Sequence, residues 1–422
     1  MKKNKIILLI VLGIVLVGLV VSIFMLFNSG NNNTLIAGSI DKTEEIKSHY
    51  NTYVTTNKEA KIYDKDDKEI GVIGDNVELS LEEIDINNDT KYFKIISNEW
   101  YINYQDVDVI EELSKEDTRY KNYIVYNKNI ITGDVTTFYD KEGNLVYKIN
   151  QSFDLPIIIN DTDKYGVEYN NKLLYVSSED VIETKDNSNT ELTNSSGVGV
   201  LNYHAFYDET DEEERSSCVT EICHSKAQFK THLDFFKENN ILTLKMEELE
   251  MYVDGKIQLP KSVLITIDDG PKTEHAVDML TEYEMYATIF LVTSWFNDID
   301  SYYKTDFIEL HSHTHDLHDG GECPGGQGGG LKCLDEEIIL TDLNTSREAL
   351  GGSTALCYPF YEYNDYTIRL AKEAGFTMGF IGESWNSDNL VHVGQDKYRL
   401  RRFVIVTYTT LNDLRNYFGQ IK

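Results

Sequence analysis

Strand and helix patterns alternate over the second half of the chain, and this alternation constrains the fold more than any other feature. Between the predicted strands lie stretches with helical spacing. In 227–240, for example, Phe229, Leu233 and Phe236 fall on one face of a helix. Such alternation predicts an α/β fold, a parallel β/α sheet or barrel, for residues 197–422. The apolar or β-branched runs typical of buried strands are 198–204, 263–267, 287–292, 307–313, 355–360, 378–382 and 401–406.

Two adjacent carboxylates follow one of these predicted strands. Asp268 and Asp269 come directly after the run 263–267, and Gly270 and Pro271 then force a turn. In a parallel β/α architecture the residues just past a strand's carboxyl end line the active-site face. Neighbouring carboxylates repel each other, so we expect them to serve a metal ion or to divide into metal ligand and base.

Histidines gather at the end of another predicted strand. Four of the ten histidines in the chain lie between residues 311 and 318. Histidine and carboxylate at separate strand ends suit a divalent, zinc-like ion. The spacing leaves the pair of ligands open: His311, His313 and His315 share a face if the strand runs straight, whereas His313 and His318 meet only if the chain bends after Thr314.

The motifs in this order resemble those of the polysaccharide deacetylases of carbohydrate esterase family 4, the NodB homology domain. They are TIDDG (266–270), SHTHDLH (312–318) and YPFYEYND (358–365), preceded by LNYH (201–204). The resemblance covers residues 197–422. It implies a distorted (β/α) barrel and metal-dependent hydrolysis of an N-acetyl group on an amino sugar.

The resemblance also implies roles for individual residues. Asp268 would be the general base, and Asp269 a ligand of a divalent metal, zinc in the first place, with cobalt or nickel as alternatives. The preferred histidine ligands are His313 and His318. The alternative pair, which fits the commoner H-[ST]-x-x-H spacing of the family, is His311 and His315.

The sequence departs from the family pattern at two points. The third motif usually begins with an arginine that orients the base, but here Cys357 stands in that place. The general acid is usually a histidine near the last strand, and His392 in NLVHVG is the candidate. Backbone N–H groups near Phe360 and Tyr361, together with His204, are expected to contact the oxyanion or the substrate.

The N-terminus predicts a membrane anchor. Lys2, Lys3 and Lys5 precede an uncharged apolar run at 6–27, which is long enough to cross a bilayer as a helix. Because lysines precede the run, we expect a cytoplasmic N-terminus and an extracytoplasmic remainder. Residues 1–28 would form the cytoplasmic tip and anchor in the cell membrane, and the polar residues 29–50 a stalk.

Residues 51–187 read as short strands separated by turns, which predicts an all-β region. The segment 91–111 resembles 164–183, so we expect two small barrels, 51–115 and 116–187, followed by a linker at 188–196. The pattern is similar to a pair of bacterial SH3-like domains, which implies binding of cell-wall peptides. The alternative is a pair of spacers without a ligand.

The net charge excludes some classes of partner, and the spacing of the cysteines predicts disulfide bonds. The formal net charge of −32 argues against nucleic acid or an anionic membrane surface as a partner. An extracytoplasmic location permits disulfides, and four of the five cysteines form close pairs, 218 with 223 and 323 with 333. We expect two local bridges rather than free thiols, with Cys357 buried on a strand.

The predicted function is removal of N-acetyl groups from the amino sugars of cell-wall peptidoglycan, with release of acetate. The first alternative is deacetylation of an exported poly-N-acetylglucosamine, which the longer spacing from His313 to His318 favours. The second is a catalytically impaired wall-binding protein, suggested by the missing motif arginine and by the weak candidate for the general acid.

Overall fold

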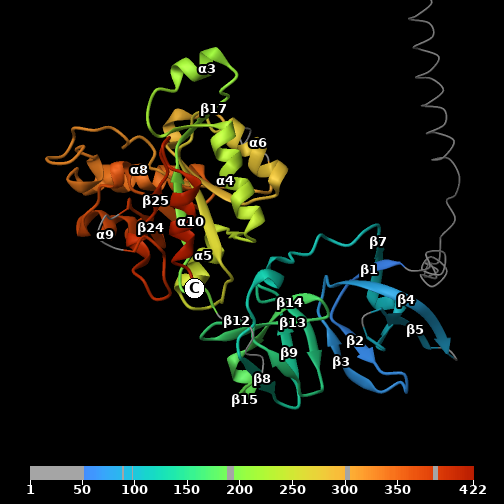
Figure 1. Ribbon diagram of the computed structural model, residues 1–422. Coiled ribbons are helices and arrows are strands. Elements are labelled where there is room, and N and C mark those ends of the chain that lie inside the picture. Colours follow the sequence, from blue (N-terminus) through green and yellow to red (C-terminus); the bar gives the residue numbers. More distant parts are fainter. Residues whose placement is uncertain (1–51, 88–89, 97, 188–193, 300–304, 384–387) are drawn as a thin grey trace, which may run out of the picture. The chain divides into compact units, whose positions relative to one another are not determined.

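The computed structural model describes residues 52–422, except for 88–89, 97, 188–193, 300–304 and 384–387 (Figure 1). The chain separates into Met1–Thr52 and Tyr53–Lys422, and the second unit is the one described below. The predicted anchor at 6–27 and stalk at 29–50 lie outside the described residues. No helix of the described part is both long and apolar enough to span a bilayer.

Residues 53–186 form strands joined by turns and short 3-10 helices, as the sequence predicts. Their strands are β1 (Tyr53–Thr56), β2 (Ala60–Tyr63), β3 (Glu69–Ile73), β4 (Glu78–Asn87), β5 (Thr90–Ile95), β6 (Tyr101–Asn103), β7 (Val107–Ile110), β8 (Lys128–Thr132), β9 (Thr136–Tyr139), β10 (Leu145–Ile149), β11 (Asp154–Pro156), β12 (Ile159–Asn160), β13 (Lys164–Tyr169), β14 (Lys172–Ser177) and β15 (Val181–Asp186). The 3-10 helices are η1 (Tyr104–Asp106), η2 (Arg119–Asn122) and η3 (Ser178–Asp180).

The internal repeat corresponds to the same local structure in both copies. In the first copy the antiparallel strands β5 and β6 lead through η1 into β7. In the second the antiparallel strands β13 and β14 lead through η3 into β15. The residue before each 3-10 turn, Asn103 or Ser177, accepts a hydrogen bond from the backbone N–H two residues on. The identity of the two modules as SH3-like barrels remains a prediction.

The two groups of strands are joined into a single sheet. Antiparallel pairing of β3 with β10 links them within a twelve-stranded order, while β8, β11 and β15 form a separate three-stranded sheet. Aromatic rings pack across the same junction, because Trp100 of the first group contacts Tyr147 and Tyr169 of the second. Tyr169 in turn stacks on Phe138, with ring centroids 4.5 Å apart.

The region from residue 199 onward is the predicted α/β domain. Seven of its strands follow the order β24-β23-β22-β21-β20-β16-β25, β19 pairs with β20 at the side, and all of these pairs are parallel. A parallel bridge from Phe380 in β24 to Leu400, just before β25, brings the two edges together as in a distorted barrel. The strands of this sheet are β16 (Gly199–Tyr203), β19 (Leu242–Thr243), β20 (Ser262–Asp269), β21 (Ala287–Leu291), β22 (Ile308–Ser312), β23 (Ala355–Cys357), β24 (Met378–Phe380) and β25 (Phe403–Val404).

Helices cover the barrel (Figure 1). They are α3 (Glu212–Ser217), α4 (Lys226–Glu238), α5 (Met246–Val253), α6 (Glu274–Tyr283), α8 (Glu336–Ala349), α9 (Asp365–Glu373) and α10 (Leu411–Gly419). The short pair β17 (Ala205–Tyr207) and β18 (Cys223–Ser225) and the 3-10 helices η4 (Thr293–Trp295), η5 (Gly330–Lys332), η6 (Pro359–Tyr361) and η7 (Lys397–Arg399) complete the domain.

Alternation along β20 decides which side chains enter the barrel. Val263, Ile265 and Ile267 belong to the core that the sheet shares with α4, α6 and α10. Leu264 points the other way, into the core that lies inside the barrel. Asp268 has the same parity as Leu264, so the fold itself directs this carboxylate into the barrel interior.

The cysteines behave as predicted. Cys218 is bridged to Cys223, and Cys323 to Cys333. Cys357 is a free, fully buried thiol at the end of β23.

Candidate metal and catalytic site

Three side chains at the carboxyl ends of β20 and β22 bring their ligand atoms together. Nε2 of His313 and Nε2 of His318 are 3.2 Å apart. Oδ1 of Asp269 lies 3.4 Å from the first and 3.3 Å from the second. The three atoms therefore form a nearly equilateral triangle.

This triangle fits a tetrahedral divalent ion. Ligand atoms about 2.0–2.1 Å from a zinc-like ion stand roughly 3.3–3.4 Å from one another, close to the separations in this site. One carboxylate and two imidazoles match the donor set of catalytic zinc sites, which keep a fourth position open. A second group, Asp268, His313 and Cys357, is also close enough to hold a metal, but Arg402 already contacts Asp268 and Cys357 there.

The turn after β20 aims Asp269 at the histidines. Asp269 has a φ of 73° and Gly270 a φ of 106°, so the chain reverses in the left-handed region immediately after the strand. A Cβ at Gly270 would stand 2.5 Å from a methyl carbon of Leu291 and 2.6 Å from the ring of Phe296. Glycine is therefore required both by the conformation and by the packing.

A main-chain carbonyl fixes the His313 ring. Nδ1–H of His313 donates to the carbonyl oxygen of Cys357 at a distance of 2.8 Å. This hydrogen bond holds the proton on Nδ1 and leaves Nε2 free for a metal, which is the usual support for a ligating histidine. The His313 side chain is almost completely buried, with 4% exposed.

The bend that the sequence required after Thr314 is present. Thr314 has a φ of 76°, and Asp342 on α8 then accepts hydrogen bonds from three successive backbone N–H groups. Its Oδ1 accepts from residue 315 at 2.8 Å, and its Oδ2 from residues 316 and 317 at 2.6 and 3.1 Å. Asp342 thus holds the loop that returns His318 to His313, a role that the sequence analysis missed.

The buried partner of Asp268 is Arg402. Nη1 and Nη2 of Arg402 donate to Oδ1 and Oδ2 of Asp268 at 2.7 and 2.8 Å, and both residues are buried. Burial alone would raise the pKa of the Asp268 carboxyl, but the guanidinium outweighs it and lowers that pKa to about 2. The thiol of Cys357 lies 3.4 Å from Oδ2. The arginine absent from the third motif is thus supplied by the segment that leads into β25.

His204 stands at the same level of the barrel as Asp268. It follows β16, whose register pairs Tyr203 with Ile267. Its buried Nδ1 has no hydrogen-bond partner among the described residues. Burial lowers the pKa of His204, while the charges of Asp268 and Asp269 act in the opposite direction.

His392 lies at the other end of the barrel. The neighbouring Val391 bridges Val198, which precedes the amino end of β16. Ser196 O and Asp388 Oδ2 are acceptors for this ring, at 2.7 Å from Nδ1 and 2.8 Å from Nε2 respectively. The length of β16, about 16 Å, separates this histidine from the carboxyl ends of the strands.

The alternative histidine pair is not brought together. His311 is buried on β22, where Nδ1 contacts the hydroxyl of Ser353 at 3.1 Å, and burial lowers its pKa to about 4. Nδ1 of His315 instead contacts the hydroxyl of Thr293 at 2.9 Å. Neither ring belongs to the ligand triangle.

The segment after β23 adopts an unusual conformation beside the triangle. Phe360 and Tyr361 have φ values of 58° and 60°, which are uncommon for aromatic residues. The ring of Phe360 is 4.9 Å from that of His318. Because the N–H of Tyr361 is donated to Tyr358 O, the N–H of Phe360 is the better candidate for an oxyanion donor.

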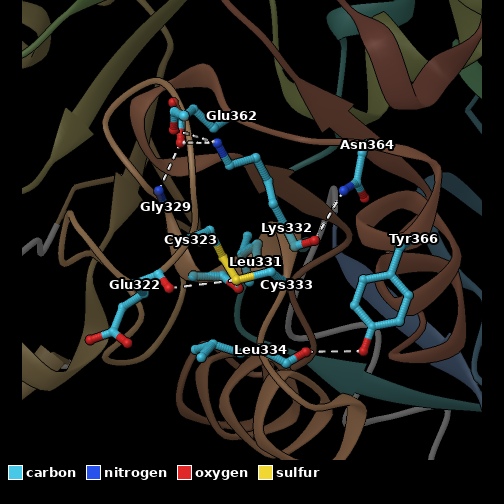
Figure 2. Close-up of a disulfide and its surroundings, with 12 residues drawn as sticks. Glu322, Cys323, Gly329, Leu331, Lys332, Cys333, Leu334, Glu362, Asn364 and Tyr366 are labelled. Atoms are coloured by element: carbon cyan, nitrogen blue, oxygen red, sulfur yellow. Dashed lines mark hydrogen bonds and ion pairs between the residues drawn. A yellow bond between two sulfur atoms is a disulfide. The ribbon is translucent and has the colours of Figure 1, made fainter.

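A disulfide loop is attached to this segment through Glu362 (Figure 2). The Glu362 carboxylate accepts hydrogen bonds from the backbone N–H of Gln327 and Gly329, at 2.6 and 2.7 Å, and pairs with Lys332 at 2.7 Å. The bridge from Cys323 to Cys333 closes the same loop. The glycine-rich loop 319–330, which follows the histidine motif, is therefore held in place next to Phe360 and forms a wall of the site.

Part of this chain is similar in sequence to polysaccharide deacetylases. Residues 256–379 match the family model described as polysaccharide deacetylase. A poly-beta-1,6-N-acetyl-D-glucosamine N-deacetylase of Staphylococcus aureus is 29% identical over 202 residues, which cover 43% of this chain and 67% of that protein. The Staphylococcus epidermidis protein of the same name is 28% identical over 201 residues, 42% of this chain and 66% of that protein.

Among solved structures, a de-N-acetylase from Aggregatibacter actinomycetemcomitans has 22% sequence identity and a TM-score of 0.44, covering 52% of this chain and 99% of that one. Together, the family match and the staphylococcal relatives support a polysaccharide deacetylase domain, and hence a hydrolase, in this chain.

Proposed function

We propose that this protein is a metal-dependent hydrolase that removes N-acetyl groups from an exported poly-N-acetylglucosamine, releasing acetate and leaving free amines. The observation that carries the proposal is the ligand triangle of Asp269, His313 and His318 beside the carboxylate of Asp268. The activity named for the staphylococcal relatives supports this polymer over the peptidoglycan first expected from the sequence.

The residues of the site divide the chemistry among them. A divalent ion such as zinc, held by the triangle, would polarise the acetamide carbonyl and lower the pKa of water toward about 7. Asp268 accepts the proton of the attacking water, and Arg402 keeps that carboxylate ionised and oriented. The contact with Arg402 also supplies a substitute for the missing motif arginine, which was one of two reasons to consider an impaired enzyme.

Bond cleavage needs an oxyanion donor and an acid. The backbone N–H of Phe360 stabilises the charge that develops on the carbonyl oxygen. The proton that Asp268 has taken from the water passes to His204, whose pKa is lowered by burial. His204 delivers this proton to the leaving nitrogen as the C–N bond breaks, so that the products are acetate and an amine. His204 takes this role in place of His392, because it stands level with Asp268 at the carboxyl end of β16.

The setting of the enzyme follows from its N-terminal half. The apolar run at 6–27 would anchor the chain in the cell membrane with the N-terminus inside, so the barrel would meet the polymer outside the cell. The two groups of strands would act as SH3-like modules that bind cell-wall peptides. The repeated hairpin and 3-10 turn support this second part of the proposal.

Acetate release tests the proposal. The full-length protein, purified in detergent with zinc, cobalt or nickel added, is assayed on β-1,6-linked N-acetylglucosamine oligomers, on β-1,4-linked chitooligosaccharides and on peptidoglycan. We expect the β-1,6-linked oligomers to be the best substrate. Faster release of acetate from peptidoglycan would overturn the substrate assignment and favour peptidoglycan, the substrate predicted from the sequence.

Three matched aspartate substitutions test the site. Asp269→Asn should lose bound metal and acetate release together. Asp268→Asn should keep the metal but lose turnover by about 100-fold or more. Asp134→Asn, at an exposed position of the β region, should change neither. Retention of both metal and turnover by Asp269→Asn would exclude the triangle as the catalytic centre.

A further inference from the structure

Trp295 is a large aromatic side chain left in contact with water. It lies on η4, directly after β21 and therefore at the carboxyl end of the barrel, and 49% of its surface is exposed. An indole ring carries a large apolar area that normally favours burial. Single exposed apolar residues are common on protein surfaces, so exposure alone does not indicate a function. The inference for Trp295 depends on its position next to the candidate site.

The backbone around Trp295 is tied to the loop that carries the metal ligands. The N–H of Thr293 donates to Thr314 O at 3.1 Å, and the N–H of Ser294 donates to His315 O at 2.9 Å. The hydroxyl of Ser294 contacts Asp316 at 3.0 Å. The segment that presents the indole is thus fixed by the same loop that brings His318 into the triangle.

The indole lies next to the ligand triangle. Its centroid is 5.2 Å from that of the His318 ring, at an interplanar angle of 72°. Phe360, whose N–H is the proposed oxyanion donor, also contacts His318, at 4.9 Å. The reacting acetamide must approach the triangle, so its sugar ring must come to rest within reach of these aromatic side chains.

We propose that Trp295 is a substrate-positioning residue that stacks against a pyranose ring of the poly-N-acetylglucosamine chain. This inference rests on the proposed function. The flat face of a β-linked N-acetylglucosamine presents C–H groups, which an exposed aromatic ring on a fixed backbone segment can cover. Binding pockets commonly combine such apolar walls with a few polar groups that set orientation, here supplied by the triangle and Asp268.

Steady-state kinetics on β-1,6-linked N-acetylglucosamine oligomers test the assignment. Trp295→Ala should raise KM about tenfold and change kcat by less than about threefold, because stacking binds the ground state and the transition state alike. Trp295→Phe should restore most of the affinity. Tyr53→Ala, which removes an aromatic residue with 39% exposure in the β region, is the control and should leave both constants unchanged.

A binding measurement separates stacking from support of the metal. Oligomers titrated into the metal-stripped protein should quench tryptophan fluorescence in the wild type and in Trp100→Phe, but not in Trp295→Phe. Metal content should be equal in all variants. An unchanged KM in Trp295→Ala, or loss of metal from it, would overturn the inference. Absence of acetate release by the wild type would instead refute the proposed function, and the titration would still report whether Trp295 contacts the sugar.

Discussion

The β region before residue 187 and the barrel after residue 199 place different groups in their interiors. The β region packs aromatic rings across the junction of its two strand groups, with Trp100, Tyr147 and Tyr169 in mutual contact. The barrel buries the ion pair of Asp268 and Arg402. Buried aromatic rings stabilise a fold and need no charged partner. Buried charges cost desolvation free energy and need a partner of opposite charge.

The difference predicts where substitutions will affect activity. If the buried charges of the barrel exist for catalysis, their removal should abolish turnover. If the aromatic cluster of the β region serves only packing, its disruption should lower stability and leave turnover on soluble oligomers unchanged. The predictions below start with the largest expected effect.

Removal of the guanidinium at 402 should have the largest effect. Arg402→Met leaves Asp268 buried without a partner, which should lower the free energy of unfolding by about 3–5 kcal/mol. Acetate release should fall by about 100-fold or more because Asp268, the proposed base, is no longer oriented. Chemical denaturation and an acetate assay measure the two effects.

The double variant Arg402→Met with Asp268→Asn provides the control for the ion pair. It should recover part of the lost stability, because no unpaired charge is left inside, and recover no activity. A double variant that loses as much stability as the single variants Arg402→Met and Asp268→Asn lose together would show that the pair is not coupled.

Acid should remove the stabilisation from this pair in a defined window. The pKa of Asp268 is lowered from 3.8 to about 2 in the folded protein. The folded state therefore binds the proton more weakly than the unfolded state, so the contribution is present above about pH 4 and is lost as the pH falls through about 2. A pH series of denaturation curves for the wild type and Asp268→Asn should converge at the acidic end.

Loss of Asp342 should weaken the metal site without touching a ligand. Asp342→Ala leaves three N–H groups of the loop 315–317 without their acceptor, so His318 should be held less firmly. We expect metal affinity to fall by about 10–100-fold, as for other groups that orient ligands. Competition with a chelator measures this affinity. Glu337→Ala, an exposed position on the same helix, should behave like the wild type.

The disulfide loop should have a smaller effect. Replacement of Cys323 and Cys333 by serine opens a loop with a sequence separation of 10 residues and should cost about 2 kcal/mol of unfolding free energy. The hydrogen bonds of Glu362 remain, so KM should rise only a few-fold. A loss of turnover comparable to that of Arg402→Met would mean that the bridge, rather than Glu362, holds the wall beside Phe360.

Disruption of the aromatic cluster should have the smallest effect. Trp100→Ala removes two ring contacts in the β region and should lower its stability by about 1 kcal/mol. Turnover on soluble oligomers should match the wild type at 25 °C. A marked fall in turnover would break the distinction between the two regions.

The sequence predicted those parts of the site that are determined by residues close together along the chain. The position of Asp268 at the end of an apolar strand and the bend after Thr314 follow from spacing along the chain. Arg402 and Asp342 escaped notice because their partners lie 134 and 25–27 residues away, and pairing at such distances is decided by the register of the barrel. One signal was available: a carboxylate directed into a barrel requires a cation, and few arginines lie near strand ends.

The proposed general acid shows the same limit. His392 lies near the last strand in the sequence, yet the register of β16 against β20 puts His204 level with Asp268. Sequence order in a barrel does not give spatial order, because the first strand lies between β20 and β25.

The acceptor that orients the His313 ring is a peptide oxygen, and this has a consequence for mutational tolerance. A substitution at position 357 changes the side chain but cannot delete the carbonyl, so the imidazole keeps its tautomer whichever residue stands there. That independence suggests how cysteine can occupy the place of an arginine at 357 while a guanidinium reaches the base from 402. Because the main chain orients His313 and a separate side chain pairs with Asp268, the residue at 357 can change without altering the orientation of the His313 ring.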